Sequence, residues 1–315
     1  MSLCEECDYE QQKIIKIVGV GGAGGNFLGN IKDKVHWVDC IVAGTDALAL
    51  INSKIPTKIQ LGVNTAKGLG AGANPEVGRA AALEAIPEIE ESLKGADMVI
   101  VLAGMGGGTG TGAAQIIAGA ARNLGALTIG IVTLPFSQEG ASRLAAAEEG
   151  VRVLSKYLDS LIVLQNDRIC HAGHDGKDIF ERYEMGDKII FDAIRGITDL
   201  VTTGRFVGID HAEMRMMLTS VRPIIYGVGH ASGENCAQDA CNEAMKFLSL
   251  SDVAISEARG ALINITGPTD LTKDEYDSVC ELIHNKVNED CDIVMGIVAD
   301  LLMKEEIKVT LYFKF

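Results

Sequence analysis

The sequence predicts an α/β protein with a parallel sheet, a long central helix, and then a smaller α+β domain with a four-stranded sheet. In the first half, near-continuous apolar runs alternate with helical stretches, which is typical of parallel strands that helices cover on both faces. The helical stretch 178–201 would span about 36 Å at the α-helical rise, long enough to connect two domains. We therefore expect one domain over 1–177, a connecting helix over 178–204 and a second domain over 205–315.

The elements of the first domain are predicted from apolar runs and from helix-end signals. Asn74 is a typical helix cap, Pro75 suits a first helical turn, and Gly95 suits the end of the same helix. Gly125 is expected to end the next helix in the same way. The predicted strands are 14–20, 40–43, 98–103, 127–132 and 161–164, and the predicted helices are 26–33, 74–95 and 113–124.

Beyond the long helix, the pattern changes to short apolar strands with two helices between them. Thr272 and Glu275 have the Thr-x-x-Glu spacing of a capping box, which marks the start of the second of these helices. The predicted strands are 223–229, 261–265, 293–298 and 307–312, and the predicted helices are 234–248 and 272–287.

The chain has 315 residues and a formal net charge of −15, which limits its partners. An acidic protein is a poor general binder of nucleic acid or of an anionic membrane. The sequence has no apolar run of about 18 residues that would predict a membrane span. Residues 1–10 carry acids rather than the basic start of a secretory signal. We expect a cytoplasmic protein that neither binds nucleic acid nor inserts directly into a membrane.

The eight cysteines are scattered along the chain, as expected for reduced thiols in a cytosolic protein. Cys4 and Cys7 form a C-x-x-C pair, but no second pair follows at the spacing of a zinc finger. Cys170, His171 and His174 lack a fourth ligand nearby in the sequence. We therefore expect no metal site built from these residues.

The segment 106–112, with the sequence GGGTGTG, is the most informative part of the chain. It lies between a predicted buried strand and a predicted helix, and its five glycines leave the backbone bare. Several N–H groups can then point at one anion, aided by the positive end of the helix dipole, which suits a chain of phosphates. The spacing and the lysine of a Walker A loop are absent. A tight turn by itself rarely needs five glycines.

A second glycine pattern, G-x-G-x-x-G over 19–24, follows the first predicted strand. With Asp39 or Asp46 as the later acid, this pattern is also the fingerprint of a dinucleotide-binding domain. An NAD-binding oxidoreductase is therefore the alternative from another class of protein. That alternative leaves the glycine-rich segments 70–72 and 106–112 unexplained.

Several ordered motifs resemble those of the tubulin/FtsZ family of GTPases, and the resemblance covers 13–315, nearly the whole chain. The motifs lie at 19–26, 70–79, 106–112, 166–168 and 264–267. The resemblance implies a GTPase that converts GTP to GDP and phosphate with Mg²⁺ and polymerises head-to-tail into cytoplasmic filaments for cell division. Its implied partners are further copies of itself and adaptors of the division machinery. A GTP-binding assembly paralogue with little hydrolysis is the alternative within the same fold.

The resemblance also implies where the phosphates bind. Residues 21–26 would wrap the phosphates, and 108–110 would hold the diphosphate. Residues 45–46 and 70–73 would approach the terminal phosphate and its Mg²⁺. The family has an asparagine at the position of Gly44, so one polar contact is lost here. The implied nucleotide contacts are Gly21, Gly22, Ala23, Gly24, Gly25, Asn26, Thr45, Asp46, Gly70, Ala71, Gly72, Ala73, Gly106, Gly107, Gly108, Thr109, Gly110 and Thr111.

Side chains are needed to recognise the base and the sugar. A carboxylate that accepts the ring N–H and the exocyclic amine of guanine selects guanine over adenine, and Asp187 matches this acid of the family. Asn166 matches the second base contact, and Glu139 with Arg143 matches the pair on the ribose and phosphate side. Without the resemblance, these residues would be a solvated helix acid, a turn former and an i,i+4 salt bridge. Gln138 stands where the family usually has phenylalanine.

The segment 208–213 matches the family loop Asn-x-Asp-x-x-Asp, which the next subunit in a filament presents to the phosphates. Asp210 and Glu213 are therefore the implied catalytic residues, although Gly208 replaces the asparagine and glutamate replaces the last aspartate. α-Tubulin also has a glutamate at this point. Without the resemblance, the pair would be a helix cap with a first-turn acid that stabilises the helix by about 1 kcal/mol. His211 is expected at the surface and not as a base.

Overall fold

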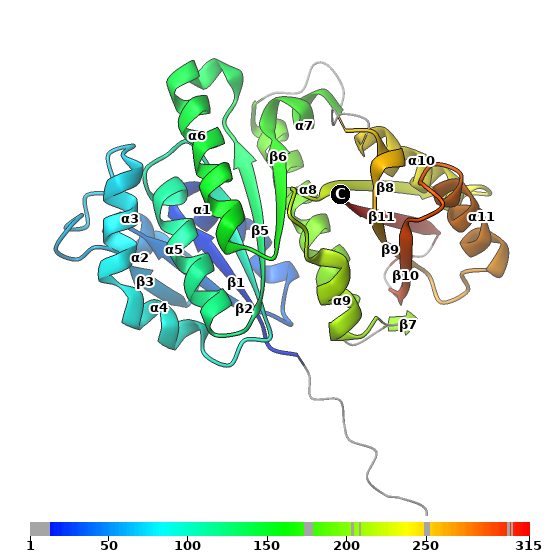
Figure 1. The fold of residues 1–315 in the computed structure, drawn as a ribbon, viewed down its shortest axis with the longest axis horizontal. Coiled ribbons are helices and arrows are strands. Elements are labelled where there is room, and N and C mark those ends of the chain that lie inside the picture. The colour runs from blue at the N-terminus through cyan, green and yellow to red at the C-terminus, as the bar shows by residue number, and fades with distance from the viewer. Residues whose placement is uncertain are drawn as a thin grey trace, which may run out of the picture.

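The computed structural model describes residues 13–172, 179–202, 205–207, 209–248, 253–300, 303 and 305–315. Two sheets lie side by side, and helix α8 (Ile179–Thr198) runs between them (Figure 1). The strands of the first sheet all precede α8 in the chain, and those of the second sheet all follow it. This architecture confirms the predicted fold class, whereas the domain boundaries at 177 and 204 stay a prediction.

The first sheet has six parallel strands in the order β3-β2-β1-β4-β5-β6. The strand order reverses at β1, which lies between β2 and β4, and open α/β sheets bind their ligands at such a point. Strand β3 is not among the predicted strands, because only one of its four residues is buried. The strands are β1 (Ile15–Val20), β2 (Asp39–Gly44), β3 (Thr57–Gln60), β4 (Met98–Gly104), β5 (Leu127–Leu134) and β6 (Ser160–Gln165).

Helices cover both faces of the first sheet. One hydrophobic cluster joins it to α1, α2 and α8, and a second cluster joins it to α3, α4, α5 and α6. Every strand of this sheet except β3 is therefore buried from both sides, as its apolar sequence predicts. The helices that precede α8 are α1 (Gly21–Ile31), α2 (Ala47–Asn52), α3 (Pro75–Glu84), α4 (Ile86–Leu93), α5 (Thr109–Asn123), α6 (Ala141–Leu154) and α7 (Asn166–Ala172).

Two predicted helix starts are wrong, because glycines expected in loops form the first turns of helices. Helix α1 begins at Gly21 instead of residue 26, and α5 begins at Thr109 instead of residue 113. Glycine is a poor helix former, but it allows these helices to pack closely on the strands. A Cβ atom at Gly24 would lie 2.2 Å from the carbonyl oxygen of Leu102 on β4, a distance that no side chain permits.

The predicted helix 74–95 is in fact two helices, α3 and α4. Pro87 lies in the first turn of α4 and has no N–H to continue a helix from α3. The other helix-end predictions for this region are confirmed. The Asn74 side chain accepts a hydrogen bond from the backbone N of Glu76, at 3.0 Å, and Gly95 and Gly125 have left-handed φ values of 76° and 87°.

The second sheet has the order β7-β10-β9-β11-β8. It contains the four predicted strands and, in addition, the three-residue strand β7, which pairs antiparallel with one end of β10 and is too short for an apolar pattern to reveal. The capping box of Thr272 and Glu275 opens α11 as predicted. The elements are β7 (Arg205–Val207), α9 (His211–Leu218), β8 (Ile225–Ser232), α10 (Cys236–Leu248), β9 (Gly260–Gly267), α11 (Lys273–His284), β10 (Asp292–Ala299) and β11 (Glu306–Lys314).

Helix α8 packs against both sheets through Ile190, Ile194 and Ile197, which are buried. It ends at Thr198 rather than at the predicted residue 201. The Thr202 hydroxyl donates to the Thr198 carbonyl oxygen at 2.9 Å, which satisfies one of the last carbonyl groups of the helix. Among the helices in the described part of the chain, α8 included, none is long and apolar enough to cross a membrane.

A group of buried charged residues joins α8 to the second sheet. The Asp192 carboxylate of α8 lies 3.6 Å from the Lys308 Nζ of β11 and 3.2 Å from the His230 Nε2 of β8. Burial raises the pKa of Asp192, but the hydrogen bond from His230 and the charge of Lys308 outweigh this effect, so the pKa lies below its usual value. Asp192 therefore carries a negative charge that compensates the buried ammonium group of Lys308.

We expect Asp192→Ala to lower the free energy of unfolding by about 3–5 kcal/mol, because it leaves the buried Lys308 without its nearest counter-charge. Urea unfolding without nucleotide measures the change. Asp33→Ala is the matched control, because Asp33 is exposed and forms no ion pair or hydrogen bond among the described residues. The control should stay within about 0.5 kcal/mol of the parent. Equal stability of the two variants would contradict the role of Asp192.

Candidate functional site

A cavity of about 470 Å³ lies at the carboxyl ends of β1 and β2, beside the point where the strand order reverses. Its walls come from the first turns of α1, from α2, from the segment after β3 and from the start of α5. The lining residues are Gly21, Gly22, Gly25, Asn26, Gly29, Asn30, Val42, Gly44, Thr45, Asp46, Ala49, Leu50, Asn52, Ser53, Lys54, Gly70 and Thr109.

Two helices begin at this cavity without a side-chain cap. Val20 precedes α1 and Gly108 precedes α5. Neither residue has a side-chain acceptor for the N–H groups of the first turn. The backbone N–H groups of both first turns are therefore available to an anion, and both helix dipoles favour negative charge here. Gly21 has a φ of 69°, and a Cβ atom there would lie 3.0 Å from the backbone N of Gly110. Only glycine allows the two helix starts to meet.

Some of the predicted phosphate contacts also serve close packing. Gly24 packs on β4, and a Cβ atom at Gly110 would lie 2.3 Å from the carbonyl oxygen of Gly104. Thr111 is buried, and its hydroxyl accepts a hydrogen bond of 2.8 Å from the backbone N of Gly106. These residues shape the loop 104–111 and do not line the cavity. Gly107 is partly exposed, and a Cβ atom there would meet nothing within 4 Å.

The segments after β2 and β3 meet at the same cavity. The hydroxyls of Thr45 and Thr109 lie 2.7 Å apart, and the backbone N of Gly70 donates to the carbonyl oxygen of Thr45 at 3.1 Å. Asp46 caps α2 by accepting from the backbone N of Ala49 with one carboxylate oxygen, at 3.0 Å. Its second carboxylate oxygen remains for another ligand.

The rest of the segment after Gly70 borders the glycine loop of α5. Ala71 is buried, and a Cβ atom at Gly108 would lie only 2.7 Å from the Ala71 side chain. Gly72 and Ala73 are exposed and have left-handed φ values of 55° and 57°. Ala23 is also exposed, on the first turn of α1, and its side chain closely approaches Gly104.

Asp187 of α8 contacts a residue of the cavity wall, although it is far away in the sequence and does not itself line the cavity. Asn30, which lines the cavity, donates from Nδ2 to Asp187 Oδ2 at 2.7 Å. Burial raises the pKa of Asp187, and the hydrogen bond from Asn30 opposes that change. Asn30 is not among the site residues predicted from the sequence. Its position four residues after Asn26, on the same face of α1, is the signal that could have identified it.

Glu139 and Arg143 form the i,i+4 ion pair expected without the resemblance, with Oε2 and Nη1 2.8 Å apart. Glu139 ends the short helix η2 (Ser137–Glu139), and Arg143 lies in the first turn of α6, both after the carboxyl end of β5. The Arg143 backbone lies against Gly106, which places the pair beside the glycine loop but outside the lining of the cavity. Asn166 begins α7 directly after β6, further along the same edge of the sheet.

Asp210 and Glu213 lie at the other edge of the first sheet. Arg215 of α9 donates to the carbonyl oxygen of Gly125, which precedes β5, and Ser220 donates to that of Asp159, which precedes β6. These contacts place α9 at the amino ends of the strands, as Figure 1 shows. A six-residue strand separates the two edges by about 20 Å.

In the single chain, Asp210 and Glu213 form a capping box. Asp210 Oδ1 accepts from the backbone N of Glu213 at 2.7 Å, and Glu213 Oε2 accepts from the backbone N of Asp210 at 3.2 Å. The arrangement is therefore the helix start expected for this sequence without the resemblance. Each carboxylate keeps one oxygen that makes no such bond. Gly208 lies outside the described residues, as do Cys4, Cys7 and His174.

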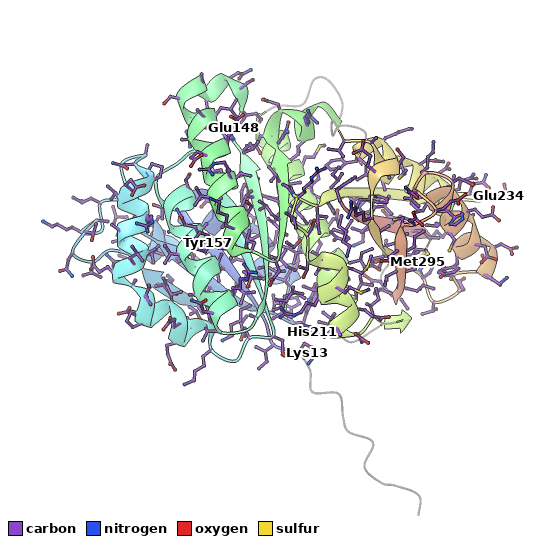
Figure 2. The ribbon with its side chains drawn as sticks, viewed as in Figure 1. Lys13, Glu148, Tyr157, His211, Glu234 and Met295 are labelled. Atoms are coloured by element: carbon purple, nitrogen blue, oxygen red, sulfur yellow. The ribbon has the colours of Figure 1, made fainter. Side chains whose placement is uncertain are left out.

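His211 is half-buried, whereas the sequence analysis expects it at the surface. Its Nδ1 has no hydrogen-bond partner among the described residues. Burial lowers the pKa of His211, and the nearby positive charges of Lys13 and Arg215 add to this effect. Figure 2 shows His211 and Lys13 close together at the end of the molecule where α9 lies.

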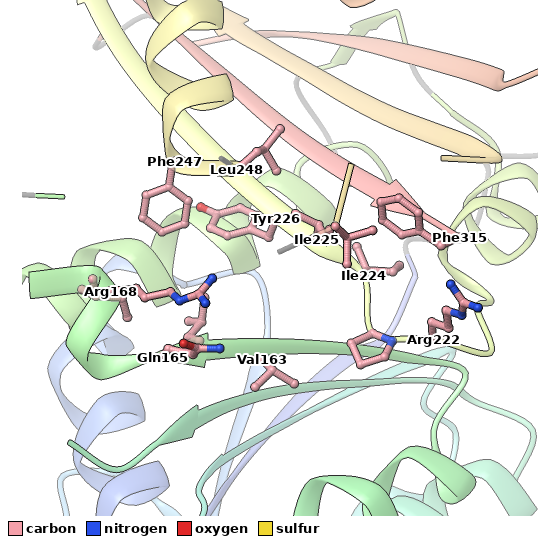
Figure 3. Close-up of a pocket in the computed structure, with 14 residues that line it drawn as sticks. Val163, Gln165, Arg168, Arg222, Ile224, Ile225, Tyr226, Phe247, Leu248 and Phe315 are labelled. Carbon is pink, nitrogen blue, oxygen red and sulfur yellow. The ribbon is translucent and has the colours of Figure 1, made fainter. Parts of the chain in front are cut away.

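A second cavity, of about 360 Å³, lies between β6 with α7 and β8 with α10 (Figure 3). Apolar groups such as Val163, Tyr226 and Phe247 make up most of its wall, with Arg168 and Arg222 among the polar groups. No glycine lines it. It therefore lacks the bare backbone that marks the first cavity as an anion site.

The fold and the first cavity together define a class of protein. A parallel sheet carries a ligand site at its switch point, and two glycine-rich helix starts supply bare N–H groups to it. An acid from a distant helix, Asp187, accepts a hydrogen bond from Asn30 in the wall of this cavity. These are the features of an α/β protein that binds a nucleotide.

Comparisons with known proteins identify the family. Residues 14–173 match the Tubulin/FtsZ family, GTPase domain, and residues 224–313 match the FtsZ family, C-terminal domain. The cell division protein FtsZ of Pseudomonas aeruginosa is 42% identical over 301 residues, which are 95% of this chain and 76% of that protein. The Buchnera aphidicola protein of the same name, from the Schizaphis graminum strain, is 38% identical over 97% of this chain and 80% of its own length.

Solved structures agree with this match. An empty FtsZ dimer from M. jannaschii superposes with a TM-score of 0.91 at 32% identity, over 98% of this chain and 89% of that one. CetZ2 from Haloferax volcanii superposes with a TM-score of 0.79 at 20% identity, over 96% and 92%, which shows a shared fold. The chain belongs to the FtsZ family of tubulin-like GTPases. The comparisons give no support to the NAD-binding oxidoreductase alternative.

We expect Gly21→Ala to weaken nucleotide binding at least tenfold, because alanine at this φ costs about 1–2 kcal/mol and its Cβ would push α5 away. Titration with a fluorescent GDP measures the affinity. Gly186→Ala is the matched control, because a Cβ atom in the middle of α8 meets nothing within 4 Å. Unchanged affinity in Gly21→Ala would show that the meeting of the two helix starts is not needed for binding.

Proposed function

We propose that this GTPase binds GTP in the first cavity and polymerises head-to-tail, with each active site completed by the next subunit. The observation that carries the proposal is the separation of the site into two parts. The anion site lies at the carboxyl edge of the first sheet, and Asp210 and Glu213 lie at its amino edge. Two such edges can meet only between different molecules, in a contact that repeats along a filament.

The phosphates would be held mainly by backbone N–H groups of α1 and α5, since Lys54 is the only basic residue that lines the cavity in the described part of the chain. Gly21, Gly22 and Thr109 would donate to phosphate oxygens from the uncapped first turns. Of the residues that the structure describes, Asp46 is the only carboxylate that lines the cavity, and it would hold Mg²⁺ through its second oxygen, directly or through water. Mg²⁺, when bound, neutralises charge on the phosphates.

Guanine would be recognised by Asp187. Its carboxylate can accept the ring N–H and the exocyclic amine, and the hydrogen bond from Asn30 fixes its orientation at the wall of the cavity. Asn166, Glu139 and Arg143 lie further along the same edge of the sheet, on the side of the second base contact and of the sugar and phosphates. Adenine offers no such pair of donors, so the site would prefer guanine nucleotides.

Hydrolysis would use the carboxylates of the neighbouring subunit. Glu213, assisted by Asp210, would orient a water molecule that attacks the γ-phosphorus of GTP, while the bond from this phosphorus to the β–γ bridging oxygen breaks. The products are GDP and inorganic phosphate. The capping box supports this role, because it fixes both carboxylates at the exposed start of α9 and leaves an oxygen of each available.

The similar proteins support two parts of the proposal, self-association and a role in cell division. The M. jannaschii structure is described as an FtsZ dimer, and that of CetZ2 as a protofilament with GTPγS bound. The bacterial relatives carry the name of cell division proteins. We therefore propose a cytoplasmic filament that acts in division and that attaches to other components through adaptors. Residues 1–177, 178–204 and 205–315 would be its nucleotide domain, connecting helix and second domain.

Asp187→Asn tests the recognition of guanine. We expect GDP affinity to fall about 10- to 100-fold, as for the loss of hydrogen bonds to a charged group, while weak ADP binding stays unchanged. Calorimetric titrations with both nucleotides measure this. Glu184→Gln, an exposed acid one turn earlier on α8, is the control and should bind like the parent. If the parent protein binds NAD⁺ more tightly than GDP, the proposed ligand is wrong.

Glu213→Gln tests catalysis by the neighbouring subunit. We expect normal GTP binding, polymers that pellet with GTP and Mg²⁺ and persist, and turnover lowered by about 10² or more. Phosphate release and sedimentation measure these effects. Glu234→Gln, an exposed acid at the far end of the second sheet, should behave like the parent (Figure 2).

A mixing experiment makes this test sharper. Gly108→Ala should block nucleotide binding, because its Cβ would lie 2.7 Å from that of Ala71, but it leaves Glu213 intact. A mixture of Glu213→Gln and Gly108→Ala should regain turnover at interfaces where the intact cavity of the first variant meets the intact α9 of the second. Parent-like turnover of Glu213→Gln alone would show that Glu213 only caps its helix.

A further inference from the structure

The segment 61–74 connects β3 to α3 and passes the cavity at Gly70. It is unusual in its backbone. Six of its residues have left-handed φ values, between 53° and 84°, and two of them, Lys67 and Ala73, are not glycine. Left-handed conformations are unfavourable for residues with a Cβ atom. Contacts from outside the segment must therefore hold it in this shape.

Glu84, the last residue of α3, makes four such contacts. Its Oε1 accepts from the backbone N and the Nδ2 of Asn64, at 2.7 and 2.8 Å. Its Oε2 accepts from the backbone N and the hydroxyl of Thr65, at 3.0 and 2.7 Å. One carboxylate thus fixes two consecutive residues of the segment, through both backbone and side chains.

These four donors keep Glu84 ionised. The hydrogen bonds from Thr65 and Asn64 lower the pKa of Glu84 to about 2. Because this pKa is lower in the folded than in the unfolded chain, the stabilisation is complete above about pH 5 and is lost as the pH falls toward 2. Near neutral pH, Glu84 is therefore a permanent anchor and not a pH switch.

Glu84 is connected to the cavity through close contacts and backbone hydrogen bonds of the segment 61–74. A Cβ atom at Gly62 would lie 2.5 Å from that of Ala81, so the segment starts in close contact with α3. It then pairs with the residues after β2, where Ala47 donates to the carbonyl oxygen of Gly68 and Gly70 donates to that of Thr45.

The far end of the segment is tied to the same helix. It returns to α3 at Asn74, whose side chain caps that helix. Both ends are therefore fixed on α3, and α3 itself packs against α5, with Gly78 close to the backbone of Gly108. A shift at Asn64 and Thr65 would thus reach Gly70 at the wall of the cavity.

We propose that Glu84 is a positioning residue for the terminal phosphate of GTP, because it fixes the segment that presents Gly70 to the cavity. The inference rests on the proposed function, in which Gly70 and its neighbours approach that phosphate. Glu84 itself lines neither cavity and touches no reacting atom. Its loss should therefore affect GTP, which has the terminal phosphate, more than GDP, which lacks it.

Glu84→Gln is the direct test, because the amide places a donor against the donors of Thr65. Below the concentration of assembly, we expect the affinity for GTP with Mg²⁺ to fall about tenfold, and that for GDP by less than about twofold. Amide hydrogen exchange in 62–73 should become faster without any nucleotide. Glu88→Gln, an exposed acid on α4 that removes the same charge, should change neither measurement.

Thr65→Val tests the contact between Thr65 and Glu84 from the side of the segment 61–74. It removes one hydroxyl donor, and we expect a smaller loss of GTP affinity that does not add to that of Glu84→Gln. Parent-like GTP affinity and exchange in Glu84→Gln would overturn the inference and leave the proposed function intact. An equal loss of GTP and GDP affinity would also overturn it, since the residue would then act on the fold in general. A parent protein that binds no guanine nucleotide would refute the proposed function itself, whereas the exchange data would still report on the anchor.

Discussion

Direct contact between backbones at the carboxyl ends of β1 and β4 is the constraint on which the rest of the structure depends. Gly24 and Gly110 bring the first turns of α1 and α5 onto β4, and Gly21 brings the two turns together. Any side chain at these points would separate the helices from the sheet. The same bare backbone that permits this packing also directs unpaired N–H groups of two helix starts at one cavity, so the fold and the anion site have one physical origin.

The second important feature is the separation of chemical groups between two edges of one sheet. Backbone donors gather where the parallel strands end, and the carboxylates of α9 lie where the strands begin. In an acidic chain with a net charge of −15, this separation keeps Asp210 and Glu213 away from the cavity of their own subunit. Helix α8 connects the two regions, since Asp187 contacts Asn30 at the wall of the cavity and Asp192 joins the second sheet through Lys308 and His230.

Much of the fold is predictable because its signals are local. Apolar runs reveal the buried strands, and Asn74, Gly125 and the Thr272 capping box mark helix ends by their own backbone requirements. The errors have physical causes. The first turns of α1 and α5 are rich in glycine, and glycine-rich sequence predicts a loop. Only the close packing of these turns on β4 explains why they are helical. Strands β3 and β7 are short edge strands, which bury too little to show an apolar pattern.

The sequence by itself determined the glycine-rich segments and the family, because glycine-rich turns and motif spacings are properties of the residues alone. The roles of Asp187, Asp210 and Glu213 stay predictions from the resemblance. Only the tertiary structure decided which of these residues meet. The contact of Asn30 with Asp187 spans 157 positions, and the anchoring of Thr65 by Glu84 depends on how α3 packs beside the segment. It also showed which glycines line the cavity and which pack against a neighbouring backbone. Such contacts arise when elements pack together, and no spacing along the chain encodes them.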